Sequence, residues 1–205
     1  MRIGVLGTGV VGQTLSAALS GLGHDVVVGS RQAPPATFAD AAQHGEVVLN
    51  CTSGVHSLEA LHSAGAEALT DKVLIDVANP LDFSGGFPPR LSVSGDDSLA
   101  EQIQRAFPRT RVVKALNTVT ASVMVAPDSL PEPTDVFLAG DDADAKTVVT
   151  DLLGQLGWSA DRVRDLGGVA AARATESYLN LWLSLMGVVG SPHFNVRLVT
   201  NEPSA

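Results

Sequence analysis

The feature that most constrains the fold is a glycine-rich segment that directly follows a short apolar run at the N-terminus. Residues 2–6 are nearly all apolar, as expected for a strand that is buried on both faces. Gly7 to Gly12 then match the pattern G-x-G-x-x-G, and apolar residues recur at helical spacing from Val11 to Leu22. A glycine-rich turn between a buried strand and a helix is typical of a βαβ unit that binds a dinucleotide.

Each glycine of this loop has a physical role in such a unit. Gly7 permits a tight turn, Gly9 lets the backbone approach a pyrophosphate, and Gly12 lets the helix pack close to the strand. The helix N-terminus adds free N–H groups and a partial positive charge. We therefore predict that the whole loop binds a cofactor, namely Gly7, Thr8, Gly9, Val10, Val11 and Gly12. The alternative is an ordinary glycine-rich turn without a ligand.

The rest of the chain alternates between patterns typical of buried strands and patterns typical of helices. Strands are predicted at 25–29, 47–51, 73–77, 111–116, 135–139 and 158–165. Helices are predicted at 38–43, 55–69, 99–107, 148–156 and 169–189, and residues 79–95 form a loop rich in proline and glycine. This order predicts an α/β fold, a Rossmann-type doubly wound parallel sheet with a small C-terminal helical addition.

The pattern becomes helical after Gly167-Gly168, where we place a soft boundary. It separates a dinucleotide-binding Rossmann domain at 1–166 from a C-terminal helical segment and tail at 167–205. Tyr178, Leu181, Trp182, Leu185 and Met186 form a stripe at helical spacing in that segment. Such a stripe is typical of a core or dimer face, and it could also wall a ring pocket.

Charge and cysteine content exclude several classes of protein. The chain of 205 residues has 13 Lys and Arg against 22 Asp and Glu, a net charge of −9, which disfavours nucleic acid and anionic membranes as partners. Cys51 is the only cysteine, so no intramolecular disulfide forms, as is usual in a reducing compartment. The five histidines lack metal-ligand spacing. These features predict a cytoplasmic protein without a metal site or a membrane span.

The end of the second predicted strand indicates which dinucleotide binds. A site for NAD places Asp or Glu there to bind the ribose 2′-hydroxyl, but this chain has Gly29-Ser30-Arg31. Ser30 can donate to a phosphate, and Arg31 can grip a 2′-phosphate or stack on adenine. We predict NADP(H) rather than NAD(H). The alternative is that Arg31 is simply a solvated surface residue.

The other strand ends carry small or amide side chains, where a ribose and a carboxamide need partners. The residues predicted to contact the cofactor there are Thr52, Ser53, Asn79, Pro80, Asn117 and Thr118. Asp76 is the only carboxylate at these ends. We predict that it bonds loop amides and is structural rather than catalytic.

Several segments together resemble the NADPH-dependent reductases of the deazaflavin coenzyme F420, within the wider NADP oxidoreductase family. They are residues 1–9, 28–31, 79–81, 112–119, 178–182 and 194–196. The resemblance implies a Rossmann domain with a helical addition, a homodimer, and hydride transfer between NADPH and a flat ring, F420 or a flavin. Thr8, Ser30 and Arg31 match adenosine-phosphate contacts, and His56 matches a histidine after the third strand. Asn117 and the segment Gln32–Pro35 depart from the family's pattern.

Hydride transfer needs alignment of two cofactors rather than acid–base groups, and the sequence offers no set of acid–base residues. We identify no certain catalytic residue; His56 and Asn117 are candidates that orient the acceptor. Two alternatives remain open. One is an NADP-dependent reductase of another small substrate, although the segment after Gly168 has no lysine of the kind β-hydroxyacid dehydrogenases use. The other is an NADPH-binding sensor or partner module without turnover.

Overall fold

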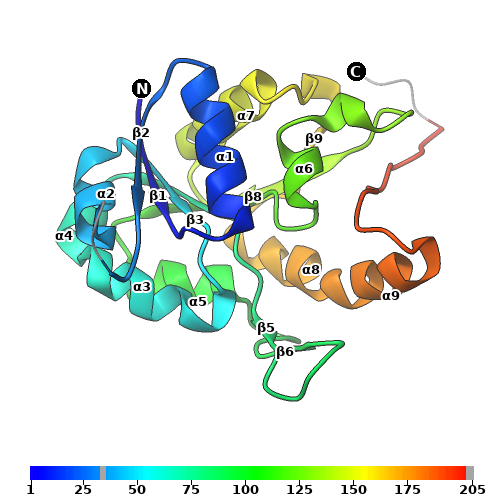
Figure 1. The fold of residues 1–205 in the computed structure, drawn as a ribbon, viewed down its shortest axis with the longest axis horizontal. Coiled ribbons are helices and arrows are strands. Elements are labelled where there is room, and N and C mark those ends of the chain that lie inside the picture. Colours follow the sequence, from blue (N-terminus) through cyan, green and yellow to red (C-terminus); the bar gives the residue numbers. More distant parts are fainter. Residues whose placement is uncertain (33–35, 202–205) are drawn as a thin grey trace.

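The structure is a computed structural model that describes residues 1–32 and 36–201. Seven strands form one sheet in the order β2-β1-β3-β4-β7-β8-β9 (Figure 1). The strands are β1 Arg2–Leu6, β2 Asp25–Gly29, β3 Val47–Asn50, β4 Val73–Asp76, β7 Arg111–Ala115, β8 Val136–Gly140 and β9 Val163–Asp165. A two-stranded hairpin, β5 Leu81–Asp82 with β6 Arg90–Leu91, projects from the body (Figure 1).

Helices cover both faces of the sheet. They are α1 Val10–Gly21, α2 Phe38–His44, α3 Ser57–Ala64, α4 Ala66–Leu69, α5 Leu99–Ala106, α6 Ala121–Met124, α7 Ala143–Gln155, α8 Ala172–Ser177 and α9 Leu179–Val189. Short 3-10 helices lie at Gly54–His56, Pro127–Ser129, Ala160–Arg162 and Val169–Ala171. Helices α1, α6 and α7 pack on one face, and α2, α3 and α5 pack on the other.

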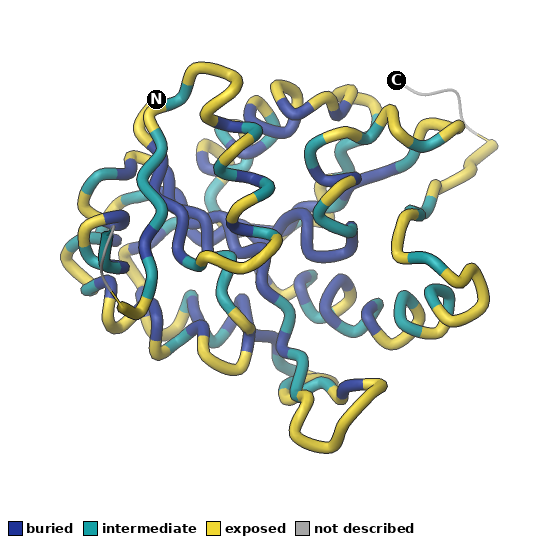
Figure 2. Tube along the Cα trace, viewed as in Figure 1, coloured by how far each residue is buried: buried dark blue, intermediate teal, exposed yellow. Residues whose placement is uncertain are grey.

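The strands are apolar throughout because side chains on both faces are buried. In β1, Ile3 and Val5 join the core beneath α1 and α7, whereas Leu6 joins the core beneath α2 and α3. Figure 2 shows the central strands as the most buried part of the chain. The predicted doubly wound sheet is therefore confirmed. No helix within residues 1–32 and 36–201 is long and apolar enough to cross a membrane.

Several elements differ from the sequence prediction. Strands β8 and β9 run antiparallel to the other five, since β8 pairs antiparallel with β7 and parallel with β9. The predicted strand 158–165 shrinks to β9, because Trp158 turns into the core and donates its Nε1–H to the carbonyl of Met124 at 3.0 Å. The predicted helix 169–189 is a 3-10 turn followed by two helices, α8 and α9. The predicted loop 79–95 contains the hairpin β5–β6.

The order of the strands determines where a ligand can bind. Strand β1 lies between β2 and β3. The chain therefore places β2 next to one edge of β1 and then crosses over to place β3 next to its other edge. Crevices in doubly wound sheets open at such a switch point, beyond the carboxyl ends of the strands. The glycine-rich loop that follows β1 lies at this point.

Candidate active site

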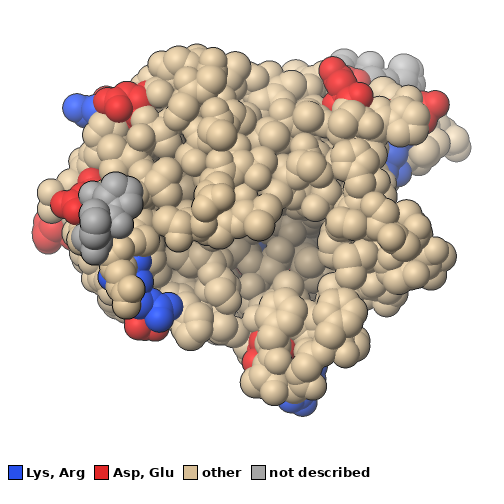
Figure 3. Space-filling model, in the orientation of Figure 1, with Lys and Arg blue, Asp and Glu red and all other residues tan. Residues whose placement is uncertain are grey.

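Two adjoining cavities lie at the carboxyl ends of the parallel strands. The first has a volume of about 590 Å³ and the second of about 450 Å³. They share Cys51, Thr52 and Ser53, which follow β3, so they form one continuous site. Figure 3 shows a hollow on this face, and most of the surface around it is neither basic nor acidic. A long, two-part site of this kind suits an extended ligand such as a dinucleotide.

The glycine-rich loop forms one wall of the first cavity. Gly7 has a φ of +118°, and a Cβ there would lie 2.7 Å from the carbonyl oxygen of Cys51. A Cβ at Gly12 would lie 2.1 Å from the carbonyl oxygen of Gly7, so only glycine lets α1 approach the loop. A Cβ at Gly9 would meet no atom within 4 Å, and no side chain caps the N-terminus of α1. The loop therefore leaves room for an anion at the helix N-terminus.

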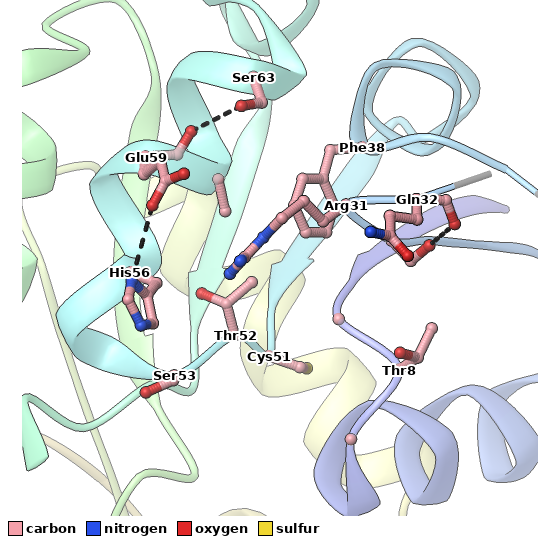
Figure 4. A pocket seen from close by; sticks show the side chains of 14 residues that line it. Thr8, Arg31, Gln32, Phe38, Cys51, Thr52, Ser53, His56, Glu59 and Ser63 are labelled. Carbon is pink, nitrogen blue, oxygen red and sulfur yellow. Dashed lines mark hydrogen bonds and ion pairs between the residues drawn. The ribbon is translucent and has the colours of Figure 1, made fainter. Parts of the chain in front are cut away.

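The end of β2 supplies the polar side chains of the opposite wall. Ser30 Oγ donates to the carbonyl of Gln32 at 2.5 Å. The exposed side chain of Arg31 lines the cavity, and Figure 4 shows its guanidinium directed inward, on the side of Thr52. Within the described residues, Arg31 has no hydrogen bond or ion pair. A guanidinium in that position is free to bind a phosphate. Ala33–Pro35, part of the segment that departs from the family's pattern, lie outside the described residues.

The two residues predicted to orient an acceptor lie in different cavities. His56 lines the first cavity, where its Nδ1 is 3.6 Å from Glu59 Oε2, and both side chains are more than half exposed (Figure 4). Asn117 is buried and lines the second cavity. The structure therefore does not bring these two residues together.

The walls of the second cavity come from five separate parts of the chain and are mostly apolar. Besides Cys51–Ser53, they comprise Val10, Val11, Gly54, Val77, Ala78, Asn79, Leu81, Phe83, Asn117, Thr118, Val119, Thr120, Ala121, Met124, Leu179 and Trp182. The cavity's mostly apolar walls suit a ring system. Pro80 lines neither cavity; its carbonyl accepts from Ser92 N at 2.7 Å and so anchors the hairpin β5–β6.

Asn79 and Asn117, which both line the second cavity, form hydrogen bonds with each other. Asn79 Nδ2 donates to the carbonyl of Asn117 at 2.7 Å, and Asn117 Nδ2 donates to Asn79 Oδ1 at 2.9 Å. Asn117 Nδ2 also donates to the carbonyl of Thr175 at 3.0 Å, so the amide is held in one orientation. The backbone turns sharply just before it, since Leu116 has a φ of +63°. Left-handed backbone at a branched, buried side chain is rare and clusters at functional sites.

A cluster of three buried charges, which we call the ion cluster, lies behind the second cavity. It consists of Lys114, Asp76 and Glu176, whose side chains are at most 2% exposed. Lys114 Nζ lies 2.8 Å from Asp76 Oδ2 and 2.9 Å from Glu176 Oε1. Burial alone would lower the pKa of Lys114, but the two carboxylates outweigh burial and raise it, so the side chain is an ammonium.

The ion cluster bears on two sequence predictions. Asp76 Oδ1 accepts from Asn50 Nδ2 at 2.8 Å and from Ala78 N at 3.3 Å, which agrees with the predicted structural role of Asp76. The sequence analysis did not single out Lys114. The available signal was a lysine within the apolar run of β7, since a lysine in a strand buried on both faces needs partners.

Cys51 lines both cavities. Burial raises the pKa of its thiol far above the ordinary value, and the charge of Asp76 raises it further. The side chain is therefore a neutral thiol and not a nucleophile at physiological pH. Within the described residues, no group of three or more His, Cys, Asp or Glu side chains could hold a metal ion.

Comparison with known proteins identifies the family. Residues 2–80 match the family described as NADP oxidoreductase, coenzyme F420-dependent. An F420-dependent NADP reductase from Methanothermobacter marburgensis is 32% identical to this chain, and the match covers 90% of this chain and 92% of that protein. The chain belongs to this family.

Two further relatives show how far the family's fold extends. A candidate F420-dependent NADP reductase from Arthrobacter sp. FB24 has a crystal structure that matches 98% of this chain and 100% of that one, with a TM-score of 0.93 and 45% identity. The rat metalloreductase STEAP3 is 29% identical over 86% of this chain, which corresponds to 36% of that longer protein. The whole described fold is thus that of the F420-dependent NADP oxidoreductase family.

Proposed function

We propose that this chain is an oxidoreductase that transfers a hydride between NADP(H) and coenzyme F420. The observation that carries the proposal is the pair of adjoining cavities. The first has a glycine loop suited to an anion and Arg31, which has no ion pair within residues 1–32 and 36–201, and the second has mostly apolar walls suited to a flat ring. Relatives along nearly the whole chain are F420-dependent NADP reductases, which supports the same pair of substrates.

We assign the first cavity to the adenosine and phosphate half of NADP(H). Gly7, Thr8 and Gly9 would face the pyrophosphate, together with the first residues of α1, Val10, Val11 and Gly12. Ser30 and Arg31 would hold the 2′-phosphate, which Ser30 can do after its hydroxyl turns away from Gln32. His56 lies at the rim of this cavity, so we assign it to the cofactor's phosphates rather than to the acceptor.

We assign the second cavity to the reacting rings. Thr52 and Ser53 would contact the ribose next to the nicotinamide, and Asn79, Asn117 and Thr118 would contact the nicotinamide or the acceptor ring. Pro80 supports this wall through its bond to Ser92. When bound, NADP(H) and F420 supply the two carbon centres between which the hydride moves. The chain's own residues align the rings and keep water from them, and no protein group has to accept the hydride.

We further propose that the protein is a homodimer. Helix α9 has no charged residue, only Leu179 of its residues is buried, and Val188 is 86% exposed. An uncharged, exposed helix is typical of an interface, and a second copy of this chain is the partner that the resemblance implies. A Val188→Asp variant that sediments as a monomer, where the wild type sediments as a dimer, would support this assignment.

We also propose that residues 1–166 bind NADP(H) and that residues 167–205 serve as interface and cavity wall. Trp182 lies in the cavity wall, and Val188 is the most exposed apolar residue of the same helix, which supports both roles. A cytoplasmic location is proposed from the single cysteine, which leaves no intramolecular disulfide, and from the acidic composition.

The proposed reaction is tested by mixing the purified protein with NADPH and F420 and following the visible absorption of the deazaflavin. We expect bleaching with NADPH and much slower bleaching with NADH. Parallel reactions contain FMN or FAD in place of F420. If NADPH binds tightly but neither F420 nor a flavin is reduced, the proposed activity is wrong, and a sensor role or another acceptor takes its place.

A further inference from the structure

We propose that Lys114 is a positioning residue that holds together the walls of the second cavity. The inference rests on the proposed function only in assigning that cavity to the nicotinamide end of NADP(H). Lys114 does not line either cavity. It acts through the three chain segments that do.

The ammonium of Lys114 binds acceptors on two different elements. It lies 2.8 Å from Asp76 Oδ2 at the end of β4 and 2.9 Å from Glu176 Oε1 on α8, and it donates to the carbonyl of Ala78. An ammonium has three N–H donors, and here each has an acceptor. An apolar side chain of the same length cannot make these bonds, so the contact is specific to the cation.

Each bonded element leads directly into a wall of the second cavity. Asp76 precedes the wall residues Val77, Ala78 and Asn79. Glu176 lies three residues before Leu179, which lines the cavity at the start of α9. These two walls are more than 90 residues apart in sequence, and Lys114 joins them in space.

The third wall follows Lys114 itself along the chain. Leu116 takes its left-handed conformation two residues later, and Asn117 then bonds both Asn79 and the carbonyl of Thr175. Asn117 and Lys114 therefore join the same three segments at two levels, one in the cavity wall and one behind it. Loss of the bonds that Lys114 makes behind the cavity is therefore expected to weaken the bonds that Asn117 makes in the cavity wall.

The first cavity is much less dependent on the ion cluster. Within the described residues, its hydrogen-bond connections to the cluster run from Asp76 through Asn50, either directly to Thr52 or by way of Ser57 to Thr52 and Ser53. In residues 1–32 and 36–201, neither the glycine loop nor Ser30 or Arg31 has a hydrogen bond or ion pair with the cluster. A defect at Lys114 is therefore expected at the ring end of the site and not at the adenosine end.

Glu176 also explains why a charge is kept at this depth. Its Oε2 accepts from Leu99 N at 2.7 Å and its Oε1 from Ala100 N at 3.1 Å, which caps the N-terminus of α5. Without Lys114, two buried carboxylates would face each other with only backbone and amide donors left. Breaking one partner of a buried ion pair is strongly destabilising, so the position of α8 depends on the lysine.

The test compares ligands that reach different parts of the site. Titration calorimetry measures binding of NADPH, which fills both cavities, and of adenosine 2′,5′-bisphosphate, which fills only the first. In Lys114→Met we expect NADPH to bind about tenfold more weakly, as for the loss of about one net hydrogen bond. The bisphosphate is expected to bind within about twofold of wild type, well below the effect of one net hydrogen bond.

Two further variants separate positioning from simple stability. Arg173→Met breaks the ion pair between Arg173 Nη2 on α8 and Glu101 Oε1, which are 2.5 Å apart. Neither residue lines a cavity, so this variant should bind both ligands as the wild type does. The neutral triple variant Lys114→Met, Asp76→Asn, Glu176→Gln removes the buried charges together. We expect it to unfold at a higher temperature than Lys114→Met, while its weak NADPH binding persists because the ammonium that joins the three segments behind the cavity is still missing.

The outcomes that would overturn the inference are distinct from failure of the proposed function. Equal losses for both ligands in Lys114→Met, an equal NADPH loss in Arg173→Met, or full recovery of NADPH binding in the triple variant would each make Lys114 a stability residue only. A wild-type protein that binds NADPH but does not reduce F420 would instead refute the proposed activity, since this test contains no acceptor.

Discussion

The two cavities of the site are built by different means. The first is formed within residues 7–63, by the loops that follow three adjacent strands and by residues of α2 and α3. Its critical features are backbone geometry and Arg31, which has no ion pair within the described residues. The second combines residues 10–11, 51–54, 77–83, 117–124 and 179–182, and a buried ion cluster lies behind it. The difference teaches that the first cavity is a local property of this chain, whereas the second, to which we assign the reacting rings, depends on long-range packing.

The largest expected effect is at Gly12, where α1 packs closely against the glycine loop that forms one wall of the first cavity. In Gly12→Ala the new Cβ would lie 2.1 Å from the carbonyl oxygen of Gly7 and push α1 away from the loop. We expect the rate of NADPH oxidation to fall roughly 100-fold, as for a misplacement of about 1 Å, and stability to fall by about 1–3 kcal/mol.

The matched control for this prediction is Gly154→Ala on α7, where a Cβ would meet no atom within 4 Å. Alanine in a helix interior is favoured over glycine by about 0.5–1 kcal/mol, so this variant should be slightly more stable and fully active. Thermal unfolding and an NADPH oxidation assay measure both. If Gly12→Ala behaves like Gly154→Ala, backbone packing does not form the first cavity.

The next largest effect is expected when the guanidinium of Arg31 is removed from the first cavity. Arg31→Ala should weaken NADPH binding about 10- to 100-fold, because a hydrogen bond to a charged group contributes about 1.5–3 kcal/mol. NADH binding should change little, since NADH lacks the 2′-phosphate. Arg109→Ala, at an arginine that pairs with Asp71, serves as the control and should change neither affinity. Equal losses for NADPH and NADH in Arg31→Ala would contradict the assignment.

A smaller effect is expected when a wall of the second cavity loses its support. Trp182 lines that cavity and stacks on Phe194 of the C-terminal tail, with ring centroids 5.3 Å apart. Such a pair contributes about 0.5–1.5 kcal/mol, so Phe194→Leu should raise the KM for the acceptor by at most about tenfold. Binding of adenosine 2′,5′-bisphosphate should not change. Phe87→Leu, at a phenylalanine that is 70% exposed and lines neither cavity, is the control.

The smallest expected effect is on stability at low pH, and it comes from Asp97, which lines neither cavity. The hydrogen bond from Arg105 holds the pKa of Asp97 at about 2, below the ordinary value of 3.8. Because the folded-state pKa is the lower one, the pair stabilises the protein above about pH 4 and this contribution is lost as the pH falls toward 2. For a partly exposed pair we expect less than about 1 kcal/mol.

Urea unfolding of wild type and Asp97→Asn measures this contribution. The two proteins should differ in stability at pH 6 and converge near pH 2. Stability that differs by the same amount at both pH values would contradict the assignment to Asp97. The cavities should be unaffected at neutral pH, because neither contains Asp97.

Local patterns were enough to predict the first cavity. The glycine loop, the absence of a carboxylate after β2 and the apolar strands all depend on residues within a few positions of one another. These predictions located Ser30 and Arg31 beside the loop because parallel neighbouring strands end at one edge of the sheet. Their binding roles remain predictions.

The second cavity could be predicted only in part. Asn79 and Asn117 were recognised as strand-end residues, but their mutual hydrogen bonds were not visible in the sequence. The direction of β8, the break between α8 and α9 and the placement of His56 in the other cavity were not predicted either. Each of these depends on contacts between segments that are far apart in the chain.

The sequence by itself determined the α/β fold, the glycine loop and the preference for a phosphorylated dinucleotide, because hydrophobic periodicity and turn chemistry act over a few residues. Only the tertiary structure decided that Lys114, Asp76 and Glu176 meet behind the second cavity. The physical reason is that a buried charge is stable only where partners from distant segments converge on it, and no local pattern encodes that convergence.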